Sequence, residues 1–116
     1  MNIATMNPDT LASSHCTSLP KGTPPLAADE IALLLPAVPD WEHASGDGLI
    51  RKTFSFSDFG GTMAFVNAVA WIAHREDHHP DMQVGYNRCR VSFSTHSVGG
   101  ISLNDFICAA KIEALL

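Results

Sequence analysis

The sequence predicts one α+β domain, a two-layer sandwich in which helices cover one face of a four-stranded antiparallel sheet. Apolar residues recur every three or four positions in three segments, which is the period of amphipathic helices. Between them lie two pairs of alternating apolar and polar segments, each pair separated by a short turn signal. Strands joined by tight turns pair antiparallel, so the predicted order is helix, two strands, helix, two strands, helix.

The domain is predicted to cover residues 26–116. Residues 1–25 are rich in Ser, Thr, Asn and Pro and have no period, so we expect a flexible N-terminal tail. The first helix is predicted within "LAADEIALLLPAVPDW". Asp29 and Glu30 suit the positive end of its dipole, and Pro36 stops it.

The next two elements are a hairpin and a long helix. Residues 41–57 predict the hairpin, with its turn at Gly46-Asp47-Gly48. Ser57 or Asp58 then suits the N-cap of a helix that ends at or before His79, because proline follows. The helix has an apolar stripe of Phe59, Met63, Val66, Ala70 and Ala73.

A second hairpin and a last helix complete the predicted fold. Residues 83–86 form the first arm, Asn87 lies at the turn, and residues 89–93 alternate as the second arm. Ser102 and Asp105 have the spacing of a capping box at the start of the C-terminal helix.

Composition limits the classes of function. Hydrophobic residues make up 46% of the chain and charged residues 16%, as in a packed domain. The net charge of −5, with no run of Lys or Arg, argues against a nucleic-acid or membrane-surface binder. We expect a soluble cytoplasmic protein, because no apolar run approaches the ~20 residues of a membrane span and no signal peptide is apparent. The three separated cysteines favour neither a disulfide framework nor a cysteine zinc site.

Histidines at predicted element ends are the candidates for chemistry. His78 and His79 lie where the long helix ends, and His96 lies where a strand ends. Imidazole titrates near neutral pH, so histidines that face one cleft can take and give protons. Asp77 or Asp105 is the candidate to orient an imidazole through its other nitrogen.

Two other interpretations stay open on spacing alone. His74 and His78 are four residues apart, which places two ligands on one helix face, with Glu76 and Asp77 as oxygen donors for a metal. However, His74 is followed by Arg75, so the H-E-x-x-H pattern is absent. The plainest interpretation is that the two adjacent histidines end a helix, favoured by its dipole, and that His96 is a turn residue.

Several separated motifs resemble the pterin-4a-carbinolamine dehydratase family. They are His78-His79-Pro80, Tyr86-Asn87, Ser94-Thr95-His96 and Ser102–Asp105, all within "EDHHPDMQVGYNRCRVSFSTHSVGGISLNDF". "LLPAVPDW" and "FSFSDF" also fit, and the resemblance runs from about Leu26 to the C-terminus.

The resemblance implies an activity and a site. Family members have the α+β sandwich, form homodimers or homotetramers, and dehydrate the 4a-hydroxytetrahydropterin released by aromatic amino acid hydroxylases, without a metal or organic cofactor. In this chain the implied catalytic residues are His78, His79 and His96. The implied substrate contacts are Asp77, the same three histidines, Ser94, Thr95 and Ser97, with Asp105 in support.

Two departures and one alternative function accompany the resemblance. Many members have Glu where this chain has His74, and many have an aromatic residue where it has Met82. Animal members also bind a transcription factor, so the alternative is an interaction module with little or no enzyme activity. The intact histidine set favours the enzyme.

Overall fold

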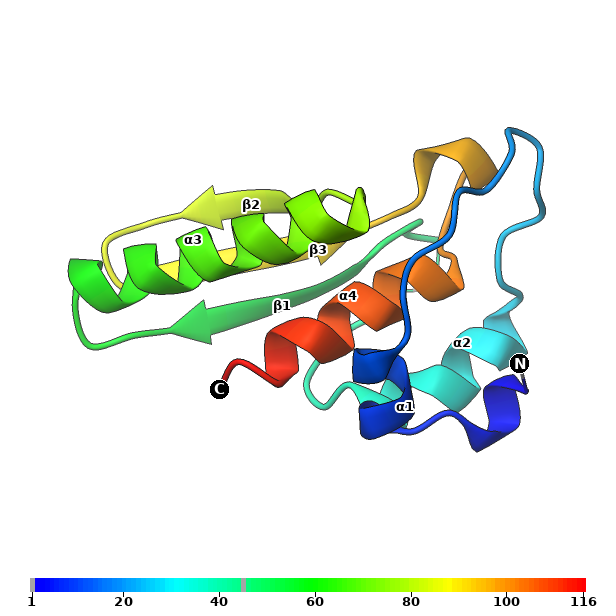
Figure 1. The fold of residues 1–116 in the computed structure, drawn as a ribbon, viewed down its shortest axis with the longest axis horizontal. Coiled ribbons are helices and arrows are strands. Elements are labelled where there is room, and N and C mark those ends of the chain that lie inside the picture. The colour runs from blue at the N-terminus through cyan, green and yellow to red at the C-terminus, as the bar shows by residue number, and fades with distance from the viewer. Residues whose placement is uncertain (1, 45) are drawn as a thin grey trace.

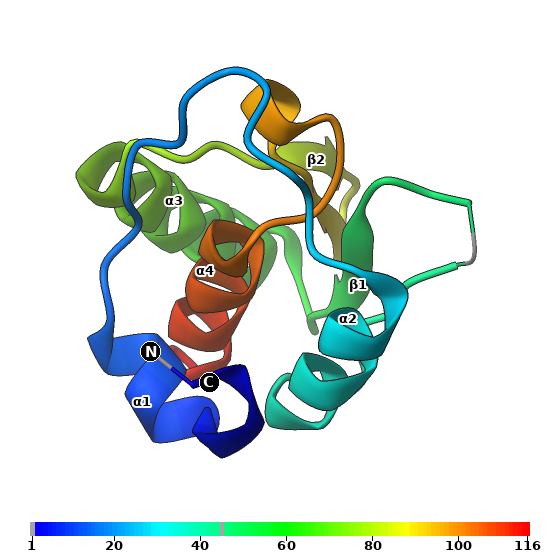
Figure 2. The same cartoon turned by 90° about the vertical axis from the view of Figure 1, so that its right-hand side faces the viewer.

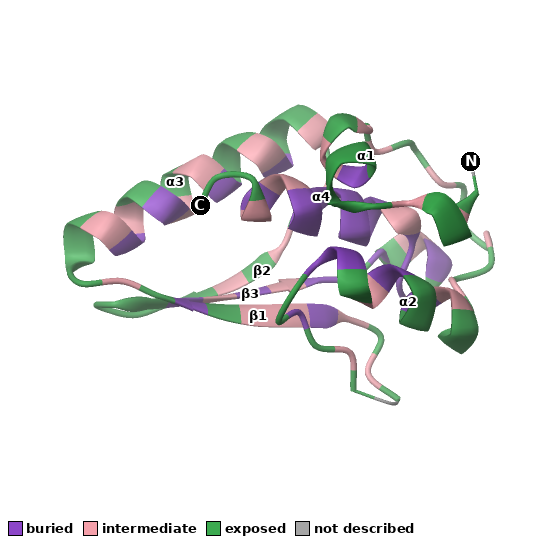
Figure 3. Cartoon of the chain, turned by 90° about the horizontal axis from the view of Figure 1, so that it is seen from below, coloured by how far each residue is buried: buried purple, intermediate pink, exposed green. Residues whose placement is uncertain are grey.

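The protein is described by a computed structural model that covers residues 2–44 and 46–116 (Figure 1). The elements are η1 (Ile3–Thr5), α1 (Pro8–Ser13), α2 (Ala28–Leu34), η2 (Leu35–Ala37), β1 (Ile50–Ser55), α3 (Phe59–Glu76), β2 (Asp81–Val84), β3 (Arg88–Phe93), η3 (His96–Val98) and α4 (Leu103–Glu113). The α+β class is confirmed, and α3 and α4 lie on the same side of the sheet (Figure 3).

The sheet has three strands in the part of the chain that is described, not the predicted four. Its order is β1-β3-β2, and both pairs are antiparallel. The missing strand is the first arm of the predicted hairpin, whose described residues contribute one isolated bridge, Glu42 to Arg51. The His43 ring instead bonds to the Asp47 carbonyl, with 3.0 Å between Nε2 and the carbonyl oxygen. Ser45, also in that arm, lies outside the described residues.

The second hairpin forms with a small shift. β2 runs from Asp81 to Val84, two residues earlier than predicted at each end. It ends at Val84 because Gly85 already belongs to the turn, where its N–H donates to the Arg88 carbonyl. Alternation along β3 is as predicted, with every second residue buried beneath the helices. Met82 is half-buried, pairs with Val91 and packs against the core.

Helix α3 buries a face adjacent to the predicted stripe. The buried residues are Thr62, Phe65, Val69 and Ala73, whereas Phe59 is exposed. Ala73 is the one residue of the predicted stripe that is buried. The segment is apolar on more than one side, so periodicity alone left the buried face ambiguous. None of the helices in the described chain is long and apolar enough to cross a membrane.

The segment expected to be a tail has structure and contacts. Helix α1 packs against α4 (Figure 2). Leu11, on α1, is fully buried in the core. A start signal was present in the sequence: Asn7 caps the helix through a capping box with Thr10, and Pro8 occupies the first turn. Residues 14–27 then run beside the start of α4 and return to α2 (Figure 2).

Candidate active site

A cavity of about 390 Å³ lies where the end of α3, the end of β3, the start of α4 and the N-terminal segment meet. It is lined by Cys16, Thr17, Ser18, Leu19, Glu76, Asp77, His78, Thr95, Ser97 and Asn104. A second cavity, of about 400 Å³, lies on the open face of the sheet beside Arg88 and Arg90. The second cavity holds none of the predicted site residues.

The end of α3 directs His78 into this region. Asp77 adopts the left-handed conformation, with φ of 50° and ψ of 44°, and its N–H closes the last turn of the helix. The His78 N–H bonds to the Ala73 carbonyl at 3.2 Å, which fixes the chain direction just before Pro80. Asp77 is not glycine, so this conformation costs free energy, as is common at functional sites.

His78 and Asp105 form a buried pair. The Nε2 atom of His78 lies 2.5 Å from Oδ1 of Asp105, and the two side chains are 12% and 0% exposed. The His78 ring also stacks on Phe93, with ring centroids 5.8 Å apart and planes 8° apart. A carboxylate on Nε2 holds the proton there, so Nδ1 is the nitrogen that can accept another proton.

The Asp105 carboxylate is held by donors on its other oxygen. Oδ2 accepts hydrogen bonds from the Thr95 hydroxyl and the Ser102 N–H, both at 2.9 Å. The Ser102 and Thr95 hydroxyls lie 2.6 Å apart. Asp105 thus completes the predicted capping box of α4, where the helix dipole favours a negative charge.

The structure brings some of the predicted site residues together and leaves others apart. Asp77, His78, Thr95 and Ser97 line the cavity, and Asp105 lies behind His78. Ser94, His79 and His96 are exposed and do not line it.

The structure also bears on the metal hypothesis. His74, one of the two candidate histidine ligands, is exposed and lies against Trp71, with ring centroids 5.7 Å apart. Across residues 2–44 and 46–116, no group of three or more His, Cys, Asp or Glu side chains is arranged to hold a metal ion.

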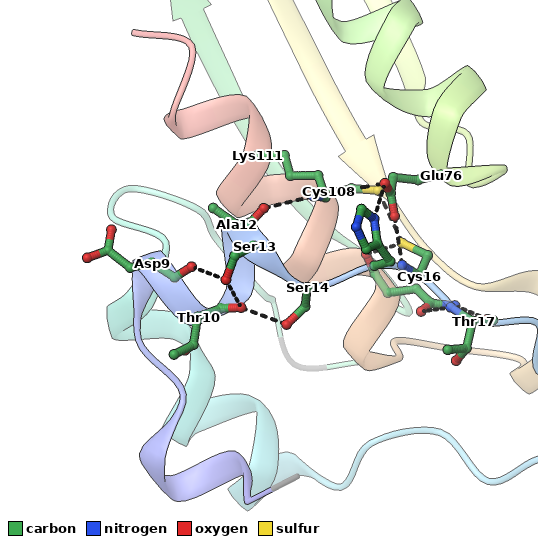
Figure 4. A network of polar contacts seen from close by, with 12 residues as sticks. Asp9, Thr10, Ala12, Ser13, Ser14, Cys16, Thr17, Glu76, Cys108 and Lys111 are labelled. Atoms are coloured by element: carbon green, nitrogen blue, oxygen red, sulfur yellow. Dashed lines mark hydrogen bonds and ion pairs between the residues drawn. The ribbon is translucent and has the colours of Figure 1, made fainter.

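Sequence reasoning missed the residues that hold the N-terminal segment against the cavity. The Glu76 carboxylate accepts from the Cys16 N–H at 2.7 Å and lies 3.0 Å from Nδ1 of His15 (Figure 4). Burial alone would raise the pKa of Glu76, but these hydrogen bonds and the positive charges of Lys111 and His15 together lower it. These contacts join residues 60 or more positions apart, so no local sequence pattern could predict them.

Comparison with known proteins identifies the family. The family model for pterin 4 alpha carbinolamine dehydratase matches residues 24–115. A Nitrosospira multiformis protein provisionally named pterin-4-alpha-carbinolamine dehydratase is 53% identical over 107 residues, which cover 92% of this chain and 93% of that protein. A similarly named Chromobacterium violaceum protein is 58% identical over 94 residues, covering 81% of this chain and 85% of its own length.

Solved structures agree with this assignment. A crystal structure described as a transcriptional coactivator/pterin dehydratase from Brucella melitensis has a TM-score of 0.75 and 33% identity, covering 78% of this chain and 97% of that chain. A pterin dehydratase-like protein described as a RuBisCO assembly factor in the alpha-carboxysome has a TM-score of 0.57 at 22% identity, covering 66% and 88%, a likeness of fold alone. The chain belongs to the pterin 4 alpha carbinolamine dehydratase family.

Proposed function

We propose that the protein dehydrates 4a-hydroxytetrahydrobiopterin to quinonoid dihydropterin and water by histidine acid–base catalysis. The observation that carries the proposal is the His78–Asp105 pair at the wall of the 390 Å³ cavity. A buried carboxylate behind an imidazole is an arrangement that fixes the tautomer and orientation of the ring, as acid–base catalysis requires. The family to which the chain belongs supports the choice of substrate.

The proposed reaction requires two proton transfers. A base removes the proton from the ring nitrogen next to C4a, and the electron pair left behind forms the new carbon–nitrogen double bond. The bond between C4a and oxygen breaks, and an acid protonates the departing hydroxyl so that it leaves as water. We assign the two transfers to His78, through Nδ1, and His96, with His79 binding the pterin. Asp77 and the Ser94–Ser97 segment are the proposed substrate contacts.

The exposure of His79 and His96 makes their assignment testable. Wild type should accelerate dehydration of chemically generated 4a-hydroxytetrahydrobiopterin, followed by ultraviolet absorbance, and the rate should be unchanged by a chelator. His96→Ala should lower kcat by about 10²-fold if His96 transfers a proton, whereas His79→Ala should mainly raise KM. Absence of acceleration by folded wild type would reject the enzyme proposal. Loss of rate with chelator alone would reject metal-free catalysis.

A second function is an interaction module. Its support is the Brucella melitensis neighbour, whose description names a transcriptional coactivator.

We also propose a homodimer or homotetramer, since β2 is an edge strand with three exposed residues and a free backbone edge suits pairing with a second chain. A supply of substrate by an aromatic amino acid hydroxylase completes the proposal of a role in tetrahydrobiopterin recycling.

Replacing Asp77 with glycine should separate its backbone role from its proposed substrate contact. Glycine adopts the left-handed conformation without strain, so we expect the variant to gain about 0.5 kcal/mol of stability in urea unfolding. Loss of the carboxylate should raise KM. Asp40 is also left-handed, with φ of 67°, and is exposed and outside the cavity lining, so Asp40→Gly is the matched control. Equal KM values in the two variants would remove Asp77 from the substrate contacts.

A further inference from the structure

Residues 16–22 cross the candidate active site, although they lie before residue 24, where the family match begins. We propose that this segment, here named the strap, is a wall of the pterin site and determines how tightly the substrate binds. The inference rests on the proposed function for the identity of the ligand. Four consecutive strap residues, Cys16 to Leu19, line the cavity.

The first attachment of the strap is Glu76. Its side chain is 6% exposed and accepts the Cys16 N–H at 2.7 Å, with His15 on the other carboxylate oxygen. Lys111 approaches the same carboxylate at 3.9 Å and donates to the Ala12 carbonyl at 2.7 Å. A buried carboxylate is therefore used to hold the main chain of the strap rather than to face water (Figure 4).

The second attachment is Asn104, whose amide pairs with both backbone groups of Thr17. The Thr17 N–H donates to Oδ1 at 3.1 Å, and Nδ2 donates to the Thr17 carbonyl at 2.8 Å. This reciprocal pairing leaves one orientation for the amide. Asn104 is buried at 7% exposure.

A third attachment fixes the other end of the strap. The Gly22 N–H donates to the Ser97 carbonyl at 3.1 Å, and Ser97 itself lines the cavity. Gly22 has φ of 91°, a conformation that favours glycine and turns the chain toward α2.

The attachments lie next to His78 and Asp105 in the sequence. Glu76 is two residues before His78, and Asn104 directly precedes Asp105. The strap is therefore attached to the end of α3 and the start of α4, which also position His78 and Asp105. A site that binds a small flat ligand tightly buries most of the ligand's surface. Loss of this wall should therefore weaken binding while the His78–Asp105 pair stays in place.

The test uses two substitutions at one position. Thr17→Pro removes the N–H that donates to Asn104, whereas Thr17→Ala keeps that N–H and removes the hydroxyl and methyl groups of the side chain. We expect Thr17→Pro to raise KM about tenfold with kcat within about twofold of wild type. Thr17→Ala should raise KM less than Thr17→Pro does, because it leaves both backbone hydrogen bonds to Asn104 in place. Direct titration with 7,8-dihydrobiopterin, which lacks the 4a-hydroxyl, should show the same weakening of Kd in Thr17→Pro.

Hydrogen exchange supplies a measurement that needs no variant. Binding of 7,8-dihydrobiopterin to wild type should slow exchange of the Cys16, Thr17 and Gly22 amides. An unchanged Kd in folded Thr17→Pro, or unchanged exchange at these amides on binding, would overturn the strap proposal. If wild type binds the dihydropterin with strap protection but fails to turn over the hydroxylated substrate, the enzyme proposal fails and the strap proposal stands.

Discussion

Replacing Asp105 with alanine is expected to lower kcat/KM by about 10²- to 10⁴-fold, the range of a lost acid–base function. The His78 ring would keep its stacking on Phe93 but lose the carboxylate that fixes its tautomer. Without that acceptor the proton is no longer held on Nε2, so Nδ1 is no longer fixed as the proton-accepting nitrogen. The loss should appear in kcat more than in KM, because the carboxylate lies behind His78, away from the cavity lining.

The same substitution should also destabilise the fold. The alanine would leave the His78 ring, the Thr95 hydroxyl and the Ser102 N–H without their shared acceptor in a buried place. Breaking a buried pair in this way costs about 3–5 kcal/mol. Kinetics must therefore be measured where circular dichroism finds the variant folded, and a conservative variant is needed to separate the two effects.

Asp105→Asn is that variant. Its oxygen can still accept from Thr95 and Ser102, so most of the stability should return. Its amide would donate toward His78 and reverse the tautomer, so the rate should stay low, as in a triad whose aspartate is replaced. If Asp105 had only a structural role, Asp105→Asn would restore both the stability and the rate. Asparagine at 105 with kcat/KM within about threefold of wild type would exclude a positioning role for the carboxylate.

A double mutant tests whether the two residues act as a unit. If Asp105 acts through His78, then removing it in a His78→Ala background should lower the rate no further. Additive losses would mean separate roles. Asp29, an exposed carboxylate in the first turn of α2, is the control position, since Asp29→Ala should change the rate by less than about twofold and the free energy of unfolding by no more than about 0.5 kcal/mol.

Local patterns predicted the parts of this protein that local chemistry decides. The capping box at Ser102 and Asp105, the cap at Asp58 and the alternation of β3 are all properties of short segments. Asp105 was a candidate to orient an imidazole, and the structure has it on His78. The catalytic roles of the histidines stay a prediction.

The errors have a common physical cause. The predicted fourth strand had a turn signal, but pairing needs a partner and a buried face. Within its described residues, the arm before Gly46 makes one bridge, from Glu42 to Arg51. The strap was missed because its bonds connect Cys16 and Thr17 to residues 60 and 87 positions away. Tertiary contacts of this kind leave no period in the sequence.

Replacing Leu11 with alanine is expected to lower the free energy of unfolding by about 2–5 kcal/mol, the usual cost of a cavity at a buried leucine. Leu11 is 0% exposed and lies on α1, which packs against α4. Urea unfolding is the measurement, with a lower midpoint and an unchanged slope as the expected result. Leu33 on α2 is 56% exposed, and Leu33→Ala is the matched control, with a change of less than about 0.5 kcal/mol.

The comparison of the two leucines decides what the N-terminal segment contributes to the domain. A mobile tail would predict no cost at Leu11, because a residue that contacts nothing in the folded state leaves no cavity when it is shortened. A cost of about 2 kcal/mol or more is a large share of the 5–15 kcal/mol that stabilises an ordinary domain. It would mean that α1 belongs to the cooperative unit, which gives the strap a fixed starting point between α1 and the cavity. Equal, small changes in the free energy of unfolding at both leucines would mean that residues 1–25 behave as a mobile tail.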